Sequence, residues 1–375
     1  MKTLHVTASL MFVLTSKLFA GSVVAWGSGD VTNCPPDLGN VTAIAAGSGH
    51  VLVLQNDGSV IAWGNNSYHQ TNVPVDLANV IAVGAGFYHS LAVKSDGTVR
   101  GWGLNNYHQR DFPADLTNAV AVSGGDGHSL VLCRNGTVTN FGQYWDPDYG
   151  AMMSLPLPAE ITNVQAIASG FNHDLLLLSN RTVLGWGANN CGQTNVPDGL
   201  TNVVAIAAGG NACLALTSDG TLVPWGATDS GQQLIPATLT NALALAIGRF
   251  HCVALKNDGK VRAWGGAGSE QSAGPAGLSN VVAIAAGDSF TVALVSAAPE
   301  APSPPFAVSS PACRDGTFTV SVPTVQGRNY RLEFKDSLAD QDWTPLDTVA
   351  GDGTTRPLTD TAASGSQRFY RVKQW

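Results

Sequence analysis

One short pattern recurs along this chain of 375 residues at a nearly constant spacing. Aromatic-Gly pairs begin at Trp26, Trp63, Trp102, Phe141, Trp186, Trp225 and Trp264. Successive pairs are therefore 37, 39, 39, 45, 39 and 39 residues apart. A second mark, an Ala-rich run closed by a glycine, ends at Gly47, Gly86, Gly125, Gly170, Gly209, Gly248 and Gly287. Two marks that each count seven copies indicate a repeat architecture, and the single interval of 45 indicates one insertion of 45 − 39 = 6 residues.

Each copy is expected to form four short strands. In the copy that starts at Asn79, the apolar run "NVIAVGAG" precedes an alternating run "HSLAVKS", which stops at Asp96-Gly97. Asp-Gly between two alternating runs predicts a hairpin with a type I′ turn, in which both central residues have positive φ. "TVRGWG" then gives a third strand and "QRDFP" an edge-like fourth, which ends at a proline because proline cannot donate to a ladder.

Four strands per unit, repeated seven times, predict an all-β fold: a seven-bladed β-propeller of four-stranded blades. The array opens with a lone third strand, "GSVVAWG", and finishes with two strands in "NVVAIAAGDSFTVALVS". A closed ring joins these partial units into one blade, whereas the alternative, an open solenoid, leaves unpaired edges. We expect the Ala-rich strand at the crowded axis and the aromatic residue between blades. The structural repeat positions are Trp26, Trp63, Trp102, Trp186, Trp225, Trp264, Gly47, Gly86, Gly209 and Gly287.

The ends of the chain differ from the repeat. A basic start, an apolar stretch and Ala20-Gly21 predict a signal peptide over residues 1–20, and the alternative is an apolar N-terminal strand. The stretch is too short for a permanent membrane span, so we expect a secreted, periplasmic or cell-surface protein. After the propeller at 21–297, the Pro-rich segment 298–311 reads as a linker. Alternating runs in 312–375 predict a small β-sandwich-like module.

Charge and residue chemistry narrow the function. A net charge of -8 leaves no basic stripe for a phosphate backbone, which argues against nucleic-acid binding. The six cysteines are scattered over small-residue positions of the repeat, and a Cys213–Cys252 bridge is disfavoured because adjacent blades splay apart. No spacing indicates a cofactor or a metal. Five histidines recur once per blade, too far apart to converge on zinc, and each is expected to bond its own hairpin: His50, His89, His128, His173 and His251.

The segments "AIAAGSGHVLVLQNDGSVIAWGNN" and "AIGRFHCVALKNDGKVRAWG" resemble the regulator of chromosome condensation repeat. That resemblance, which covers about Gly21 to Ser296, implies a seven-bladed propeller. The nuclear member that gives the family its name is a guanine-nucleotide exchange factor, a function that an acidic, exported chain is not expected to share. Within that family, the segment "WGNNSYHQTNVP" most resembles the secreted propeller-type beta-lactamase inhibitor group. The C-terminal module is loosely similar to small β modules of exported bacterial proteins.

Strand alternation places two sets of loops on one face of the ring: those after each Ala-rich run and those after each Trp-Gly. These loops are rich in aromatic residues, which are typical of protein-binding hot spots, although turn aromatics can also cap blades. The predicted partner-binding residues are Tyr68, Phe87, Tyr88, Tyr107, Tyr144, Trp145, Phe171, Phe250 and Phe290. The insertion at 143–158 is a candidate contact loop, and Asp146 and Asp148 make it a weak catalytic candidate.

These observations favour a secreted, monomeric, non-enzymatic propeller that binds another macromolecule, above all a protein, through this face. An alternative is an inhibitor of a beta-lactamase or penicillin-binding enzyme. Further alternatives are a hydrolase or lyase acting on polysaccharide and a structural surface protein. No nucleophile-base pair, phosphate loop or metal spacing supports catalysis, and guanine-nucleotide exchange would rest on fold analogy alone.

Overall fold

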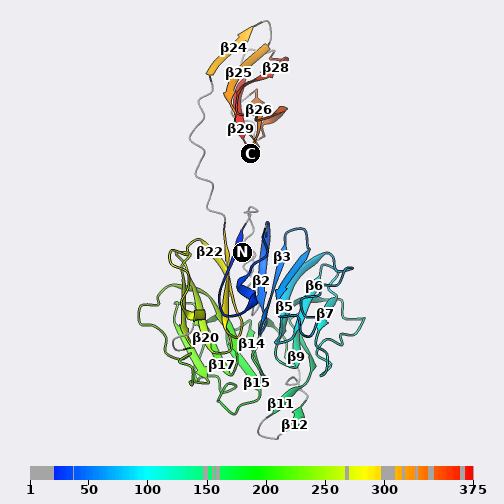
Figure 1. Ribbon diagram of the computed structural model, residues 1–375, viewed down its shortest axis with the longest axis vertical. Helices are drawn as coiled ribbons and strands as arrows, with labels where there is room; N and C mark the ends of the chain where they lie inside the picture. The colour runs from blue at the N-terminus through cyan, green and yellow to red at the C-terminus, as the bar shows by residue number, and fades with distance from the viewer. Residues whose placement is uncertain are drawn as a thin grey trace. The chain divides into compact units, whose positions relative to one another are not determined.

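The computed structural model describes residues 21–36, 38–146, 151–153, 157, 161–266, 270–296, 309–314, 317–324, 326, 328–336, 342–363 and 368–374. The predicted signal peptide and most of the predicted linker lie outside these residues. The chain divides into two compact units, 1–297 and 298–375, and each is described by itself (Figure 1).

The described part of the first unit contains seven antiparallel sheets of three strands. In six sheets the strands follow one another along the chain, and the first strand is the innermost. Three of these blades are β2 (Val41–Ala46), β3 (His50–Gln55) and β4 (Val60–Gly64); β5 (Val80–Ala85), β6 (His89–Lys94) and β7 (Val99–Gly103); β8 (Ala119–Gly124), β9 (His128–Cys133) and β10 (Val138–Gly142). Three more are β13 (Val164–Ser169), β14 (His173–Leu178) and β15 (Val183–Gly187); β16 (Val203–Gly209), β17 (Ala212–Thr217) and β18 (Leu222–Gly226); β19 (Ala242–Ile247), β20 (His251–Lys256) and β21 (Val261–Gly265).

The seventh blade closes the ring. The N-terminal strand β1 (Ser22–Gly27) pairs with β23 (Phe290–Val295), which pairs in turn with β22 (Val281–Ala286). The β1–β23 register runs from Ser22 opposite Val295 to Gly27 opposite Phe290. The inner strands contact one another in the cyclic order β2, β5, β8, β13, β16, β19, β22 and back to β2. This closure confirms the predicted ring, and Figure 1 shows β22 beside the N-terminal strands.

The predicted fourth strand is wrong, because within the described residues no blade sheet contains a strand from the segment that follows its third strand. After β7, the Arg110 N–H donates to Asn105 Oδ1 at 3.0 Å and the Tyr107 N–H donates to Gln109 Oε1 at 3.0 Å. His108 adopts a left-handed conformation with φ 62. Side-chain amides thus satisfy the backbone donors that a strand would offer to a ladder.

The Asp-Gly hairpins exist, but their predicted type I′ turn is wrong. In the first blade, Gln55 N–H donates to Ser59 O at 2.9 Å and Gly58 N–H donates to Gln55 O at 3.0 Å. Gly58 has φ 82, whereas Asp57 is not among the positive-φ residues. This is a three-residue loop, a tight turn followed by a left-handed glycine, so only one residue needs positive φ. Asp57 Oδ1 accepts the Ser59 N–H at 2.9 Å, which favours Asp before the glycine.

The tryptophans lie between blades, as predicted. Trp102 is buried among Leu52 and Leu54 of the preceding blade, and Trp225 is buried in the same way. The indole N–H of Trp225 donates to the Gln193 carbonyl at 3.0 Å. Burying such a ring contributes about 2–3 kcal/mol to blade adhesion. The loop glycines allow the inner strands to approach, because a Cβ at Gly86 would overlap the His89 ring.

The recurring histidines bond the next blade, so the prediction that each bonds its own hairpin is wrong. His50 Nε2 lies 2.9 Å from Ser90 Oγ, and the Ser90 hydroxyl donates to the Gln70 carbonyl at 2.7 Å. We call these contacts the interblade histidine pairs. They are His50–Ser90, His89–Ser129, His128–Asp174, His173–Cys213 and His251–Thr291. All five histidines are fully buried, so each pair replaces water inside the ring.

Five cysteines are free, namely Cys34, Cys133, Cys191, Cys213 and Cys252, and the side chain of Cys313 lies outside the described residues. Cys213 occupies the serine position of an interblade pair, and its thiol donates to the Gln193 carbonyl at 3.2 Å. Burial raises the pKa values of the Cys213 and Cys252 thiols. Both residues act as small buried donors. Within the described residues, no helix is long and apolar enough to span a membrane.

The remaining elements of the first unit are short. The insertion forms a hairpin of β11 (Tyr144–Asp146) and β12 (Ala151–Met153). Two 3₁₀ turns, η1 (Asp30–Thr32) and η2 (Glu270–Ser272), lie in the loops after β1 and β21. Because β11 follows the third strand of its blade, the hairpin stands on the same face as the loops after the Ala-rich strands.

The second unit contains two three-stranded sheets, ordered β24-β25-β28 and β27-β26-β29. Their bounds are β24 (Ser309–Arg314), β25 (Thr317–Pro323), β26 (Asn329–Lys335), β27 (Thr344–Ala350), β28 (Thr355–Asp360) and β29 (Phe369–Gln374). The sheets share a core that includes Val322, Tyr330 and Leu358. The first strand begins at Ser309, so the sheet starts inside the segment predicted to be linker.

Candidate functional site

One position in each blade carries the chemical variety of the ring. It is the residue directly after the loop glycine, between the inner and the middle strand. The glycine before it repeats in every blade, whereas this position holds a serine, two phenylalanines, two aspartates, a glycine and an arginine. We call these residues the apical ring: Ser48, Phe87, Asp126, Phe171, Gly210, Arg249 and Asp288.

Backbone hydrogen bonds join neighbouring members of the apical ring. Phe171 N–H donates to Gly210 O at 2.8 Å, and Asp126 N–H donates to Phe171 O at 3.1 Å. Asp288 N–H donates to Ser48 O at 3.1 Å across the closure of the ring. Backbone hydrogen bonds of this kind link five of the seven pairs of successive loops, so this part of the face is a preorganised platform for side chains that differ.

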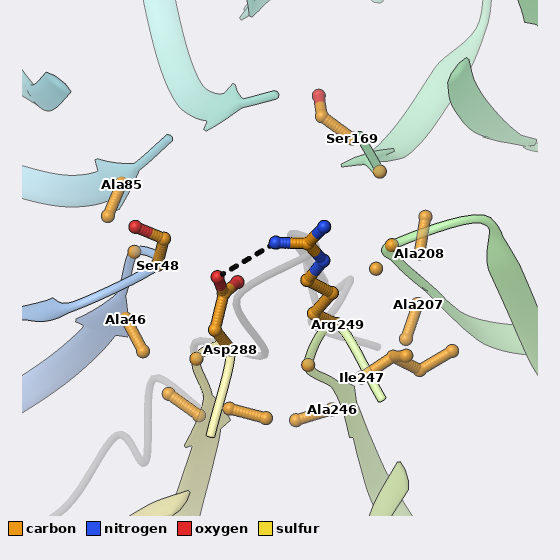
Figure 2. Close-up of a pocket in the computed structure, with 18 of the residues that line it drawn as sticks. Ala46, Ser48, Ala85, Ser169, Ala207, Ala208, Ala246, Ile247, Arg249 and Asp288 are labelled. Atoms are coloured by element: carbon orange, nitrogen blue, oxygen red, sulfur yellow. Dashed lines mark ion pairs between the residues drawn. The ribbon is translucent and has the colours of Figure 1, made fainter. Parts of the chain in front are cut away.

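The cavity beneath the apical ring is small. It is lined by the Ala- and Gly-rich inner strands, and its volume is about 80 Å³. Figure 2 shows Arg249 and Asp288 pointing over it, with Ser48 and Ser169 nearby. Pockets that enclose a cofactor or a drug-sized ligand are several times larger. The cavity suits a few waters, so the surface around its mouth is the candidate site.

Aromatic rings form a continuous cluster on this face. The Phe87 and Phe171 rings meet edge to face with centroids 4.7 Å apart. Tyr88 contacts Phe87 at 6.0 Å and Tyr68 at 5.0 Å. Tyr68 is 43% exposed and Phe250 is 39% exposed. Edge-to-face pairs hold rings in fixed positions, which lowers the entropy lost when a partner covers them.

Arg249 connects the aromatic cluster to the charges. Its guanidinium lies 5.7 Å from the Phe171 centroid, 5.0 Å from the Phe250 centroid and 3.7 Å from Asp288 Oδ2. Burial raises the pKa of Asp288 to about 6, although Arg249 offsets part of this effect. Burial also raises the pKa of Asp126. The site therefore combines exposed rings, one cation and two partly desolvated carboxylates.

The structure brings together five of the nine predicted face residues. Tyr68, Phe87, Tyr88 and Phe171 are in direct contact, and Phe250 joins them through Arg249. Each is half-buried or exposed, which places it where a partner can reach it.

Of the other four predicted face residues, Tyr107, Tyr144 and Phe290 have described side chains. Tyr107 is half-buried against Gly127, where a Cβ would lie 2.8 Å from Tyr107 Cδ2. Tyr144 and Phe290 are buried, so their predicted place on the exposed face is wrong. Phe290 occupies the histidine position of its blade, where a Cβ on Gly287 would overlap its ring. The side chain of Trp145 lies outside the described residues.

Aromatic composition alone did not point to the charged members of the site. Asp126, Arg249 and Asp288 become visible when the copies are aligned on their loop glycines and read position by position. The carboxylates predicted as weak catalytic candidates, Asp146 and Asp148, have side chains outside the described residues. In the part of the chain that is described, no group of three or more His, Cys, Asp or Glu side chains converges on a possible metal position.

A closed ring of repeated blades with one variable loop face defines a repeat-built β-propeller. The family model for the "Regulator of chromosome condensation (RCC1) repeat" matches residues 41–70, 80–109, 164–193, 203–232 and 243–271. The two copies it leaves out are the one that runs into the insertion and the one split between β1 and β22–β23. The chain therefore contains five copies of this repeat, and its fold is that of an RCC1-type propeller, as the sequence resemblance predicted.

Solved structures share this fold. Prp20p from Saccharomyces cerevisiae is 20% identical with a TM-score of 0.63, over 76% of this chain and 93% of Prp20p. Human WBSCR16 is 19% identical with a TM-score of 0.57, over 74% of this chain and 99% of WBSCR16. The ectodomain of the receptor kinase CR4 from Physcomitrella patens is 21% identical with a TM-score of 0.55, over 74% of this chain and 80% of the ectodomain. The comparison with curated proteins found no match.

Proposed function

We propose that this chain is an exported, non-enzymatic binding protein that holds another protein against its apical-ring face. The observation that carries the proposal is the continuous cluster of Tyr68, Phe87, Tyr88 and Phe171 on loops that backbone hydrogen bonds tie to one another. Aromatic residues and arginine dominate the binding energy of protein interfaces, and a rigid platform loses little entropy on binding.

A propeller of this fold can hold protein partners. The yeast protein Prp20p is described with binding properties to Gsp1p and histones. At 20% identity this supports the use of the fold as a scaffold and does not transfer those partners. The net charge of -8 also disfavours any partner whose binding surface is acidic.

Export is part of the proposal and rests on residues 1–20. The expected mature protein starts at Gly21, which directly precedes the ring-closing strand β1. Mass spectrometry of the protein from its native host tests this expectation. An intact N-terminus in a cell-internal fraction would contradict the secreted, periplasmic or surface location, while the binding face would be unaffected.

The binding proposal is tested by replacing Phe87, Tyr88, Phe171 and Phe250 together with serine. Partner capture from an extracellular or periplasmic extract should be lost, because the hot-spot area is removed, while the melting temperature should stay within a few degrees. The matched control replaces Ile81, Leu184 and Leu243, which are 38–43% exposed and lie near the strand ends of the opposite face. Equal capture by both variants, or collapse of stability in the first, would contradict the proposed face.

A narrower form of the proposal is inhibition of a serine beta-lactamase or penicillin-binding enzyme. Its support is the loop sequence around Tyr68, which follows the Trp63-Gly64 pair, together with the exposed position of Tyr68. Hydrolysis of a chromogenic cephalosporin by purified beta-lactamases, with the chain in molar excess, tests it. Undiminished hydrolysis across enzymes of different classes would restrict the proposal to other protein partners.

A further inference from the structure

Within the proposed binding function, we infer that the apical ring recognises a basic side chain, arginine or lysine, on a projecting loop of the protein partner. The side chain would lie beside Asp126, against the rings of Phe87 and Tyr88. The inference rests on the proposed function, because it assigns the chemistry of the partner at the same face.

The charges of the apical ring do not balance. Asp126 and Asp288 carry two negative charges, and Arg249 is the one basic member. Arg249 is already engaged, since it lies 3.7 Å from Asp288. Within the described residues, the carboxylate of Asp126 makes no hydrogen bond or ion pair. The Asp126 carboxylate therefore has no cation in direct contact, and Arg249 offsets its charge only through space.

The position of Asp126 would strengthen its electrostatic interaction with an added cation. It is half-buried, flanked in the ring by Phe87 and Phe171, and its N–H is fixed to the Phe171 carbonyl at 3.1 Å. A charge that has already lost part of its water interacts more strongly with a new partner than a fully solvated charge at the rim does. A partner that covered this face without a cation would leave the carboxylate buried and unpaired, at a cost in affinity.

The ring itself shows how such a cation is held. The guanidinium of Arg249 lies over the Phe171 and Phe250 rings and pairs with Asp288. Asp126 also stands between two aromatic members of the apical ring, since its N–H bonds the Phe171 carbonyl at 3.1 Å and the Phe87 N–H bonds the neighbouring Gly125 carbonyl at 3.0 Å. Cations above aromatic faces gain further attraction once water is excluded. The arrangement around Asp126 differs from that of Arg249 and Asp288 because it lacks the cation.

The surroundings favour a protein loop over a free small cation. The cavity below is only about 80 Å³, so it offers no enclosed seat. The aromatic cluster extends from Tyr68, after β4, to Phe250, after β19, so its rings come from loops of several blades. A macromolecule can cover that span while one side chain reaches Asp126.

The test uses the full chain and two phage-displayed libraries of disulfide-closed heptapeptides, one with a fixed central arginine and one with a fixed central glutamate. On the wild-type chain, the arginine library should be enriched about tenfold over the glutamate library. Asp126→Asn should bring the two to parity. The matched control Asp111→Asn removes an exposed carboxylate that pairs with His108 in an outer loop, and should leave the ratio unchanged. Asp126→Ser, which copies Ser48 at the same position, replaces the asparagine variant if that variant fails to fold.

Three outcomes would overturn the inference. They are equal enrichment of both libraries on the wild-type chain, an arginine preference that survives in Asp126→Asn, and displacement of the arginine peptides by spermidine at micromolar concentration, which would indicate a small-cation site. The inference fails separately from the proposed function. If the four-serine variant loses partner capture while Asp126→Asn shows no change in charge selectivity, the proposed binding face is supported and the inferred preference for a cation is contradicted.

Discussion

Two seams between blades follow the same plan with different chemistry. Between the first two consecutive blades, His50 and Ser90 form a neutral buried hydrogen bond of 2.9 Å. Between β9 and β14, His128 lies 3.1 Å from Asp174, and both side chains are 0% exposed. Asp174 Oδ2 has no partner. A hydroxyl is sufficient at this position, so the carboxylate adds a desolvation cost that the other seams avoid.

The blade β13–β15 departs from the repeat in further ways. It follows the insertion, and its hairpin carries Arg181 with φ 65 where five other blades have glycine. The remaining blades keep neutral interblade pairs and glycine turns wherever those elements occur. Departures that cost stability are therefore concentrated in one blade, which makes the regular blades internal controls for it.

The largest expected effect separates the two seams. His128→Phe should lower the free energy of unfolding by about 3–5 kcal/mol, because it leaves the buried Asp174 without its partner. His251→Phe should cost only about 1 kcal/mol, because Thr291 keeps its 3.1 Å bond to the Gln271 carbonyl and Phe290 already shows a phenylalanine at this position. Denaturant unfolding at pH 7 measures both. Equal losses would mean that the seams are equivalent.

The neutral seams should make the ring sensitive to acid. Burial lowers the pKa of His89 to about 3 and lowers those of His50, His173 and His251 to about 4. Between pH 6.5 and 4 these histidines bind protons in the unfolded chain but stay neutral in the folded chain. Their contribution to the free energy of unfolding is therefore complete above pH 6.5 and is lost as the pH falls toward 4. Each histidine should cost about 3 kcal/mol by pH 4.

Comparing the wild-type chain with His251→Phe isolates one of these histidines. Between pH 6.5 and 4, the free energy of unfolding of the variant should fall by about 1.4 kcal/mol per pH unit less than that of the wild-type chain. Unfolding free energies measured from pH 7 to pH 4 give both slopes. Parallel curves would show that His251 does not take up a proton on unfolding.

Asp174→Ser should convert the charged seam into a neutral one. We expect a gain of about 2 kcal/mol at pH 7, because His128 would then face a hydroxyl as His89 faces Ser129. The melting temperature and the denaturant midpoint report the change. The gain should vanish in the His128→Phe background, and a loss of stability in the single variant would show that the carboxylate contributes more than its desolvation costs.

The smallest effect concerns the turn. Arg181→Gly should stabilise the chain by about 1 kcal/mol, because a left-handed conformation is strained for a residue with a Cβ and free for glycine. The reverse change, Gly220→Arg in a regular blade, should cost a similar amount, because Gly220 has φ 87 and a Cβ there would meet nothing within 4 Å. Denaturant unfolding of both variants tests whether the conformation or the side chain decides the difference.

The sequence was sufficient for the architecture because spacing and residue size determine it. Glycine at the loop and tryptophan at the seam are required by close approach and by burial, so their period predicted both the blades and the closure. The turn type was wrong because Asp-Gly suits two loop lengths. The histidine partners were missed because Ser90 lies 40 residues from His50, in a neighbour that no local pattern reveals.

The candidate site was predictable only in part. Exposed rings such as Tyr68 and Phe250 were found from loop composition, whereas Phe290 was misplaced although it stands three residues after Gly287, in the histidine position. Asp126 and Arg249 act through charge in a partly desolvated setting. That setting depends on the packing of neighbouring loops, which composition does not report.

The pairing of β1 with β23 also determines how long the first strand stays unpaired while the chain is synthesised. Gly27 and Phe290 are partners, so the first strand must wait for about 260 further residues before its edge is satisfied. At ribosomal speeds of about 5–20 residues per second, that wait lasts on the order of 10–50 seconds. During this time the nascent chain exposes an unpaired apolar strand, so a chaperone that shields residues 22–27 would govern the yield of native protein.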